Sequence, residues 1–355
     1  MSKLSRADIL TMFGYKAGTK LYNLLYSSCA NFCCIVKNCL GISSSGNPNL
    51  VLNQQGDWLD VINGTNFLRV AATENNVNNG NNFLTLYNLA KTLTPNGLPL
   101  SSTNRLTLIV DPGYYSFSTM LNIDAQYIDI VSKTGNTDLF FEFTSPNTIY
   151  VTANDVYLRG INVGTTSFRI ATNLALLKCE KCKGGNVSFN SLIETVVASG
   201  TFIDCEGGNN SFGTWNGVMA FPVNGSTTGT FIRCKGGAES FGSRNSCGGL
   251  FIDCEGTSQN AFGRGSVITG TFIRCRAFGN FSFGQGTGST STGFYYYCIG
   301  GVNNFSSATN NGFYYHCVSG SSSFTGLSGA STGKALYCVN NNNPFNYGFT
   351  ATNMI

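Results

Sequence analysis

Short apolar runs alternate with polar turns from about residue 180 to about residue 345. The runs are about five residues long and rich in Phe, Ile, Tyr and Thr, which favour strands, and the segments between them are rich in Gly, Asn and Ser. Six copies read Gly-x-aromatic-apolar-x-Cys, as in GTFIDC and GTFIRC, and two copies are looser. The cysteines of these copies, separated by 23, 29, 20, 21, 23, 19 and 21 residues, are Cys182, Cys205, Cys234, Cys254, Cys275, Cys298, Cys317 and Cys338.

A period near twenty-one residues predicts a solenoid of stacked coils. A phenylalanine also follows each cysteine by seven or eight positions, so chance does not account for the pattern. The Leu-rich framework of a leucine-rich repeat is missing, and a propeller blade needs about forty residues. We therefore predict an all-β fold, a parallel β-helix over residues 105–348. Its right-handedness follows from the crossover rule for parallel strands.

Alternation along a strand assigns its faces. It places each cysteine and the residue two before it on one face, which is apolar and is therefore predicted to point inward. These partners are Ile203, Ile232, Ile252, Ile273, Tyr296, Tyr315 and Leu336. The same rule turns a column of aromatic residues outward, namely Phe202, Phe231, Phe251, Phe272, Tyr295 and Tyr314. Such a column could form a trimer seam or a sugar-stacking strip, but we favour packing, between chains or in the core after a strand bend.

The residues on either side of the cysteines form two columns whose charges alternate in sign. Before the cysteines stand Lys181, Asp204, Arg233, Asp253 and Arg274, and after them stand Lys183, Glu206, Lys235, Glu255 and Arg276. Equivalent positions of a solenoid stack about 4.8 Å apart, where opposite charges attract and like charges repel. We predict two exposed charge ladders over five coils, whose main value is to fix the register of the coils.

Beyond Arg276 the charges give way to apolar and aromatic residues. Ile299, Val318 and Val339 follow the last three cysteines, and Tyr297, His316 and Tyr337 precede them. An apolar strip on an outer surface often marks an interface. Tyr297, His316 and Tyr337 are therefore the candidate interface with sister chains or with a receptor.

An earlier and less regular stretch also shows strand patterns. Strands are predicted at 105–110, 127–131, 139–143, 148–153 and 156–161. The segments LTLIVDPGYYSFSTMLNI and TIYVTANDVYLRGINV resemble the entry coils of pectate-lyase-like β-helices, which read as an apolar strand, Pro-Gly-x-Tyr and then "v-x-L-x-G-I". This resemblance implies the fold, and a fold alone does not give a function.

The first fifty residues differ in character. Ser5 and Asp8 are placed as in a capped helix start. LSRADILTMFG followed by GTKLYNLLYSS resembles a short N-terminal segment of fibre-like virion proteins of Bacteroidetes phages, including the crAss-like group, although the acidic residues usual in its second helix are missing. The resemblance implies a virion-attachment region at 1–50. The remaining divisions are a linker or cap region at 51–104, the β-helix at 105–348 and a C-terminal tail at 349–355.

Composition narrows the function classes. Charged residues make up only 11% of the chain, and the net charge of +4 comes from scattered residues, so we expect no nucleic-acid binding. The sequence contains no run of about twenty apolar residues, so we expect no membrane insertion. The first twenty residues lack the apolar core of a signal peptide, so we expect assembly in a cytosol and free, buried thiols. We expect no cofactor.

Three groups of residues could carry chemistry. Cys29, Cys33, Cys34 and Cys39 could hold zinc, but the adjacent pair is awkward for that, and buried or interface thiols are favoured. The only histidine, His316, is expected on the surface. Two acid pairs, Asp204 with Glu206 and Asp253 with Glu255, could serve glycan hydrolysis, but Arg233 and Lys235 between them would keep the acids ionised. Asp111, Asp124, Asp129 and Asp138 are isolated in the earlier coils.

These observations favour a structural virion protein, a head or tail fibre or spike subunit for rigid display and host-surface adhesion. The resembling families are commonly homotrimers, so we expect three chains, with other virion proteins bound through the N-terminal region and host surface glycan as a candidate partner. We expect no enzymatic activity. The alternatives are a tailspike polysaccharide depolymerase and a bacterial surface adhesin.

Overall fold

The computed structural model describes residues 66–171, 173–190, 197–212, 226–241, 246–263, 267–283, 290–305, 309–321, 324, 332–340 and 343–347. The predicted attachment region at 1–50, its cysteine cluster and the predicted tail at 349–355 lie outside these residues.

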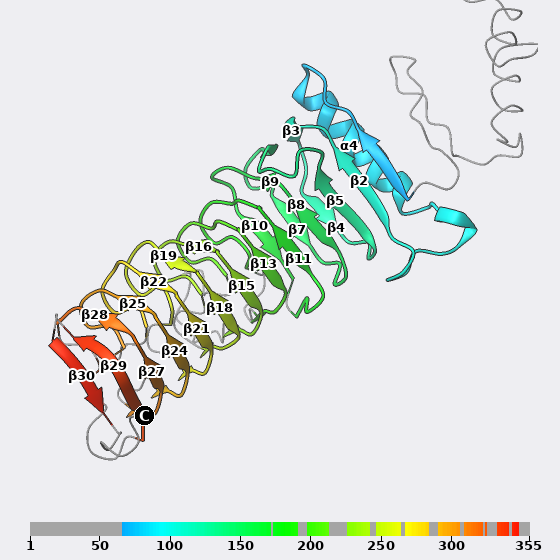
Figure 1. Cartoon of the computed structure of the whole chain (residues 1–355). Helices are drawn as coiled ribbons and strands as arrows, with labels where there is room; N and C mark the ends of the chain where they lie inside the picture. The colour runs from blue at the N-terminus through cyan, green and yellow to red at the C-terminus, as the bar shows by residue number, and fades with distance from the viewer. Residues whose placement is uncertain are drawn as a thin grey trace, which may run out of the picture. The chain divides into compact units, whose positions relative to one another are not determined.

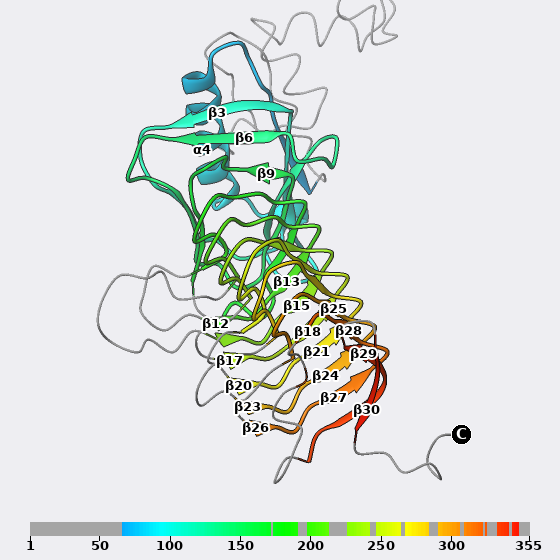
Figure 2. The same ribbon diagram turned by 90° about the vertical axis from the view of Figure 1, so that its left-hand side faces the viewer.

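The described chain is a parallel β-solenoid with about 22 residues in each coil (Figure 1). The predicted fold class is therefore confirmed. The register of neighbouring strands gives the same coil lengths as the cysteine spacing: Lys178 pairs with Thr201, and Thr201 with Thr230. Strands of equivalent position follow one another along the stack, as Figure 2 shows from the side.

One face of the coils runs the whole length of the solenoid. Its parallel strands are β1 (Phe67–Val70), β2 (Leu106–Val110), β5 (Ile128–Ser132), β8 (Tyr157–Arg159), β11 (Lys178–Glu180), β13 (Thr201–Ile203), β15 (Thr230–Ile232), β18 (Leu250–Ile252), β21 (Thr271–Ile273), β24 (Phe294–Tyr296), β27 (Phe313–Tyr315) and β29 (Lys334–Asn340). We call it the first face. The last strand pairs antiparallel with β30 (Asn343–Tyr347), which ends the parallel stack.

The second face follows the first after a corner. Its strands are β3 (Gly113–Phe117), β6 (Leu139–Phe143), β9 (Ile161–Asn162), β16 (Lys235–Gly236), β19 (Glu255–Gly256), β22 (Arg276–Ala277), β25 (Ile299–Gly300) and β28 (Val318–Ser319). Isolated bridges from Asn162 to Lys183, then to Glu206 and to Lys235, connect its early and late parts.

Two smaller sheets close the coils. The early one holds β4 (Leu121–Ile123), β7 (Ile149–Val151) and β10 (Phe168–Ile170). The late one holds β12 (Val197–Ala198), β14 (Ser226–Thr227), β17 (Ser246–Cys247), β20 (Val267–Ile268), β23 (Thr290–Ser291) and β26 (Thr309–Asn310).

The solenoid begins earlier than residue 105. Strand β1 pairs in parallel with β2, so its residues lie in the range predicted as a linker or cap but belong to the stack. The same range holds helix α4 (Asn76–Ala90) and a 3₁₀ turn at Pro95–Gly97. The Asn75 side chain caps α4 by accepting the N–H of Asn78 at 3.0 Å.

Helix α4 packs on β3. The Phe83 ring lies 5.2–6.4 Å from the rings of Tyr115, Phe117 and Phe141. Gly80 permits this approach, because a Cβ atom there would stand 2.1 Å from the carbonyl oxygen of Ser116. The helix therefore covers the early coils with an aromatic cluster.

The predicted inward face of the repeat was partly wrong, because a corner interrupts the strand. The residue before each cysteine has a left-handed backbone, with φ of 53° at Asp204 and 52° at Arg233. This turn directs both Phe202 and Cys205 into the core and leaves Ile203 half-buried on the outside. The same holds for all seven residues that were predicted to point inward with the cysteines, because each is half-buried on the outer surface. They are Ile203, Ile232, Ile252, Ile273, Tyr296, Tyr315 and Leu336.

Two aromatic columns fill the core of the repeat. The strand column contains Phe202, Phe231, Phe251, Phe272, Tyr295 and Tyr314, stacked 4.7–5.1 Å apart. The turn column contains Phe189, Phe212, Phe241, Phe262, Phe283, Phe305 and Phe324, stacked 4.8–5.2 Å apart. Rings of the two columns meet edge to face at 5.5–6.0 Å. The strand bend that was weighed for the first column therefore places it in the core.

The cysteines form a third internal column. The thiol of Cys234 lies 3.2 Å from the carbonyl oxygen of Phe202, and that of Cys254 lies 3.2 Å from the carbonyl oxygen of Phe231, each one coil earlier. The ten described cysteines are all buried and free. Burial raises the pKa of thiols such as Cys205 and Cys275, and it raises the pKa of Cys247 to about 12. These thiols are thus packing groups with a weak hydrogen bond.

Candidate binding surface

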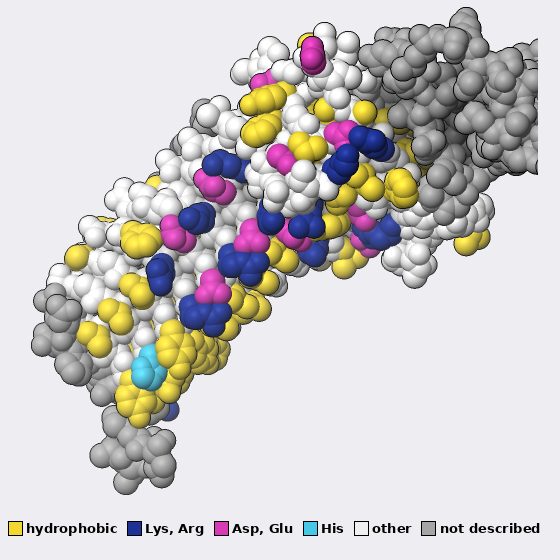
Figure 3. All heavy atoms as spheres, turned by 45° about the horizontal axis from the view of Figure 1, so that its top comes forward, with side chains coloured by type: hydrophobic (Ala, Val, Ile, Leu, Met, Phe, Trp, Pro, Cys, Tyr) yellow, Lys and Arg dark blue, Asp and Glu magenta, His cyan; other side chains and the backbone are white. Residues whose placement is uncertain are grey.

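The corner between the first and second faces presents two parallel columns of side chains. The corner column holds Lys181, Asp204, Arg233, Asp253, Arg274, Tyr297, His316 and Tyr337. The second column holds Lys183, Glu206, Lys235, Glu255, Arg276, Ile299, Val318 and Val339. The cysteine between each pair points inward, so the two columns border the outer surface of the corner. Figure 3 shows their alternating blue and magenta side chains.

Ion pairs connect neighbouring coils along both columns. Arg233 donates through Nε and Nη2 to both oxygens of Asp204 at 2.6 and 2.9 Å. Arg274 holds Asp253 in the same bidentate way, at 2.7 Å for each bond. In the second column, Lys183 lies 2.9 Å from Glu206 and Lys235 lies 3.9 Å from Glu255.

These pairs decide what the acids can do. Hydrogen bonds from Arg233 and Arg274 lower the pKa of Asp204 and of Asp253, respectively. A carboxyl group whose ionised form is stabilised is a poor general acid near neutral pH. Asp204 and Asp253 therefore act as partners of the arginine one coil later.

The candidate interface residues lie in the three coils beyond the charges. The Tyr297 and His316 rings stack 5.3 Å apart, and the His316 and Tyr337 rings stack 4.9 Å apart. Tyr297 is 52% exposed and Tyr337 is 45% exposed. Ile299 and Val318 are also exposed beside them. Figure 3 shows this group as the yellow area around the cyan histidine.

A surface hollow of about 410 Å³ lies where the charged and aromatic parts meet. Its lining comes from three successive coils: Asp253, Cys254 and Glu255, then Arg274 and Arg276, then Tyr297 and Ile299. Within this lining, Arg274 is hydrogen-bonded to Asp253 of the preceding coil.

An apolar stripe crosses the outside of the first face. It consists of the seven half-buried residues at the position of Ile203, which the strand register places side by side from Ile203 to Leu336. Seven coils at the strand spacing give a stripe roughly 30 Å long. Phe294, which is exposed, and Phe313, which is half-buried, broaden it in the last coils. Sequence alternation missed this outward stripe.

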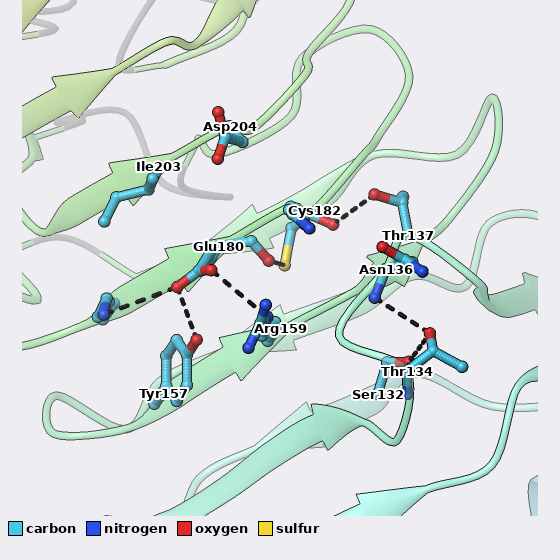
Figure 4. A network of polar contacts seen from close by, with 12 residues as sticks. Ser132, Thr134, Asn136, Thr137, Tyr157, Arg159, Glu180, Cys182, Ile203 and Asp204 are labelled. Atoms are coloured by element: carbon cyan, nitrogen blue, oxygen red, sulfur yellow. Dashed lines mark hydrogen bonds and ion pairs between the residues drawn. The ribbon is translucent and has the colours of Figure 1, made fainter.

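The early coils place their charges differently. Arg105 contacts Asp129 and Asp155, each at 2.6 Å, and the Asp129 residue is only 8% exposed. Glu180 accepts a hydrogen bond from the Tyr157 hydroxyl at 2.7 Å and forms an ion pair with Arg159 at 3.4 Å (Figure 4). Both clusters lie on the first face and link successive coils.

The other early aspartates each have their own partners. Asp111 contacts Arg69 at 2.8 Å and Lys133 at 3.3 Å, and Asp124 contacts Lys91 at 2.6 Å. Asp138 accepts hydrogen bonds from the hydroxyl groups of Ser132 and Thr134. Asp111 and Asp138 both lie near Tyr115, because after burial the charge of each raises the pKa of that hydroxyl group.

Two features bear on metals and membranes. Among the described residues, no group of three or more His, Cys, Asp or Glu side chains could hold a metal ion. No helix in the part of the chain that the structure describes is long and apolar enough to cross a membrane. Cys29, Cys33, Cys34 and Cys39 fall outside that part.

Comparisons with known proteins give no relative. No family model matches the chain, no curated protein matches it, and no solved structure matches it. The fold and the outer surfaces of the coils are therefore the basis for assigning a function.

Proposed function

We propose that this chain is a structural subunit of a fibre or spike on a tailed-phage virion, which displays a rigid β-solenoid and adheres to the host surface. The observation that carries the proposal is the outer surface of the repeat. Its acids at the corner are bound to cations of neighbouring coils, while apolar and aromatic side chains remain exposed beside them. Such a surface suits contact better than proton transfer.

The core supports a rigid role. Two stacked aromatic columns and a column of buried thiols repeat through successive coils, so each coil is held mainly by its neighbours. The resemblance of the N-terminal segment to fibre-like virion proteins supports location on a virion assembled in the host cytoplasm. In this proposal that segment binds other virion proteins.

The apolar stripe supports association of chains. It presents seven half-buried residues in a line along the coils, in addition to the exposed Phe294. A homotrimer would bury these stripes along its axis. The ion-paired columns beside the stripe would then stay at the rim, where exposed charges favour solubility.

Light scattering coupled to size-exclusion chromatography tests the association. We expect the full chain to elute as a trimer and the double variant Ile252→Asp/Ile273→Asp to elute as a monomer, because two carboxylates per chain would enter the buried stripe. Val267→Asp is the control, since Val267 is 47% exposed and lies on β20, in the late small sheet and not on the first face. A wild-type monomer would contradict the trimer.

Incubation with bacterial surface polysaccharide tests whether the protein cleaves glycan. We expect the chain length of the glycan, followed by size-exclusion chromatography, to stay constant during prolonged incubation with the full protein. Shortened glycan would show a depolymerase and contradict the structural role.

A further inference from the structure

We infer that the hollow between Arg276 and Tyr297 binds an acidic sugar residue, a hexuronic acid or another carboxylated sugar, on the target surface. The inference rests on the proposed adhesive function and adds to it a site and a ligand class. Three features of the hollow support it: a cation with no ion pair to the described residues, a half-exposed aromatic ring, and the size of the hollow.

The cation is Arg276. In the strand register it stands between Glu255 and Ile299. Glu255 lies 3.9 Å from Lys235, and Asp253 is bound by both nitrogens of the Arg274 fork. Each acid of the hollow thus has its own cation. Arg276 contributes to lowering the pKa of Asp253, but no carboxylate of the described residues lies within 4.0 Å of its guanidinium, whose donors can therefore bind a ligand. A planar guanidinium fork matches a carboxylate.

The aromatic ring is Tyr297. One of its faces is covered by His316 in the next coil, with an angle of 10° between the rings. The ring also meets Tyr315 at 5.7 Å with an angle of 89°, and among the described residues no cation lies over it. Tyr297 lines the hollow and is half-exposed. A sugar ring can pack its apolar C–H face against such a ring while its polar groups stay in water.

The size of the hollow limits the ligand. A volume of about 410 Å³ is near the small end of the roughly 300–1,000 Å³ typical of small-molecule sites. It fits one or two sugar residues of a longer chain. Ile299 supplies a further apolar wall. Because Arg276 belongs to the second column, the carboxylate of the sugar would lie on that side of the hollow.

Charge distribution explains why the site occurs once in the repeat. In the preceding coils of the corner column, each position equivalent to Tyr297 carries a charge, namely Lys181, Asp204, Arg233, Asp253 and Arg274. In the following coils, the positions equivalent to Arg276 are Ile299, Val318 and Val339. Among the described residues of the two columns, an arginine of the second column is followed by an exposed ring of the corner column at this boundary alone.

Titration calorimetry with two probes tests the inference. The probes are a trisaccharide of galacturonic acid and a trisaccharide of galactose, each added to the full chain. We expect saturable binding of the uronate, at least tenfold weaker binding of the neutral sugar, and weaker uronate binding at high salt because the contact is ionic. Arg276→Gln and Tyr297→Ala should each weaken uronate binding about tenfold.

Matched controls keep the test specific. Arg69→Gln removes an exposed cation of the early coils, and Tyr114→Ala removes an exposed ring there, so both should bind the uronate like the wild type. Equal binding of the two sugars, no saturable binding of the uronate, or unchanged binding by Arg276→Gln would overturn the inference. A trimer that ignores the uronate would refute this site alone, whereas a monomer that binds it would refute the proposed assembly and leave the site standing.

Discussion

The early coils and the repeat both stack parallel strands, but they bury different side chains. Strands β2 and β5 have five residues each and bury aliphatic side chains such as Leu108 and Ile130. Strands β15 and β18 have three residues each and bury one aromatic ring, followed by a corner and a cysteine. Both regions keep a parallel register, but only the repeat uses the same residue types in coil after coil.

The comparison shows what stabilises coils whose strands are short. In the repeat, eight residues of the corner column have a left-handed backbone, which costs roughly 1–2 kcal/mol per non-glycine residue. Stacked rings and thiol–carbonyl bonds on either side of the corner offset that cost. In the early coils the longer strands carry more ladder hydrogen bonds, and charges link the coils from partly buried positions.

The largest expected effect concerns the aromatic columns. Phe251→Ala should destabilise the protein by about 3–5 kcal/mol, because it opens a cavity in a fully buried stack with Phe231 and Phe272. Urea unfolding followed by circular dichroism measures it. Phe278→Ala is the control, since Phe278 is 64% exposed, and should change the free energy of unfolding by less than about 0.5 kcal/mol. Similar losses in both variants would remove the distinction between core and surface rings.

A smaller effect is expected from the buried charges of the early coils. Arg105→Gln should cost about 2–4 kcal/mol, because it leaves Asp129, which is buried, and Asp155 without their common cation. The same unfolding measurement applies. Arg233→Gln, in the exposed corner column, is the matched substitution and should cost at most about 1 kcal/mol. If the two losses were equal, the contrast between the two regions in their use of charge would not hold.

The thiol column should give a still smaller loss. Cys254→Ala removes a small buried group and its hydrogen bond to the Phe231 carbonyl, and it should cost about 1–2 kcal/mol. Burial and the raised pKa of Cys247 and Cys275 also predict that these described thiols react with iodoacetamide only after unfolding. Mass spectrometry of alkylated peptides measures this. Rapid modification of Cys254 or Cys275 in the native protein would contradict a closed core.

The smallest effect is expected from the exposed ion pairs. The hydrogen bonds from Arg274 lower the pKa of Asp253 in the folded state, so the pair contributes stability above the unfolded pKa of about 4. That contribution is lost as pH falls through the folded pKa. Asp253→Asn should therefore cost only a few tenths of a kcal/mol at pH 7, and the cost should shrink as the pH falls toward 2. Unfolding curves at the two pH values, with Glu74→Gln as an exposed control, measure it. A penalty for Asp253→Asn that persisted at pH 2 would contradict the ion-pair explanation.

The sequence predicted the repeat because equal positions stack on each other and therefore carry equal side chains. The cysteine spacing matched the strand register, and the strands predicted from residue 105 onward are present in the structure. Strand β1 was not predicted, because its partner β2 lies 40 residues ahead, across α4, and the spacing of the repeat is absent there.

Alternation failed at the corner for a physical reason. A polar residue between Ile203 and Cys205 looks like an ordinary outward position, but Asp204 adopts a left-handed backbone and reverses the face. The signal that could have shown this is the uniformity of the strand column. Four phenylalanines followed by two tyrosines at equivalent positions indicate rings stacked in a core, while the mixed Ile, Tyr and Leu column is typical of a surface.

Deletion of whole coils tests the central claim, that the repeat is a stack of interchangeable units, most directly. Because Thr230, Leu250 and Thr271 are equivalent, residues 250–270 form one coil and residues 230–270 form two. Both deletions should give proteins that unfold cooperatively in urea. The two-coil deletion should be the better tolerated per coil removed, since it places Asp204 beside Arg274, whereas the one-coil deletion places Arg233 there. Removing only residues 250–259 should prevent folding. A half-coil deletion as stable as the whole-coil deletions, or whole-coil deletions that fail to fold, would contradict the account.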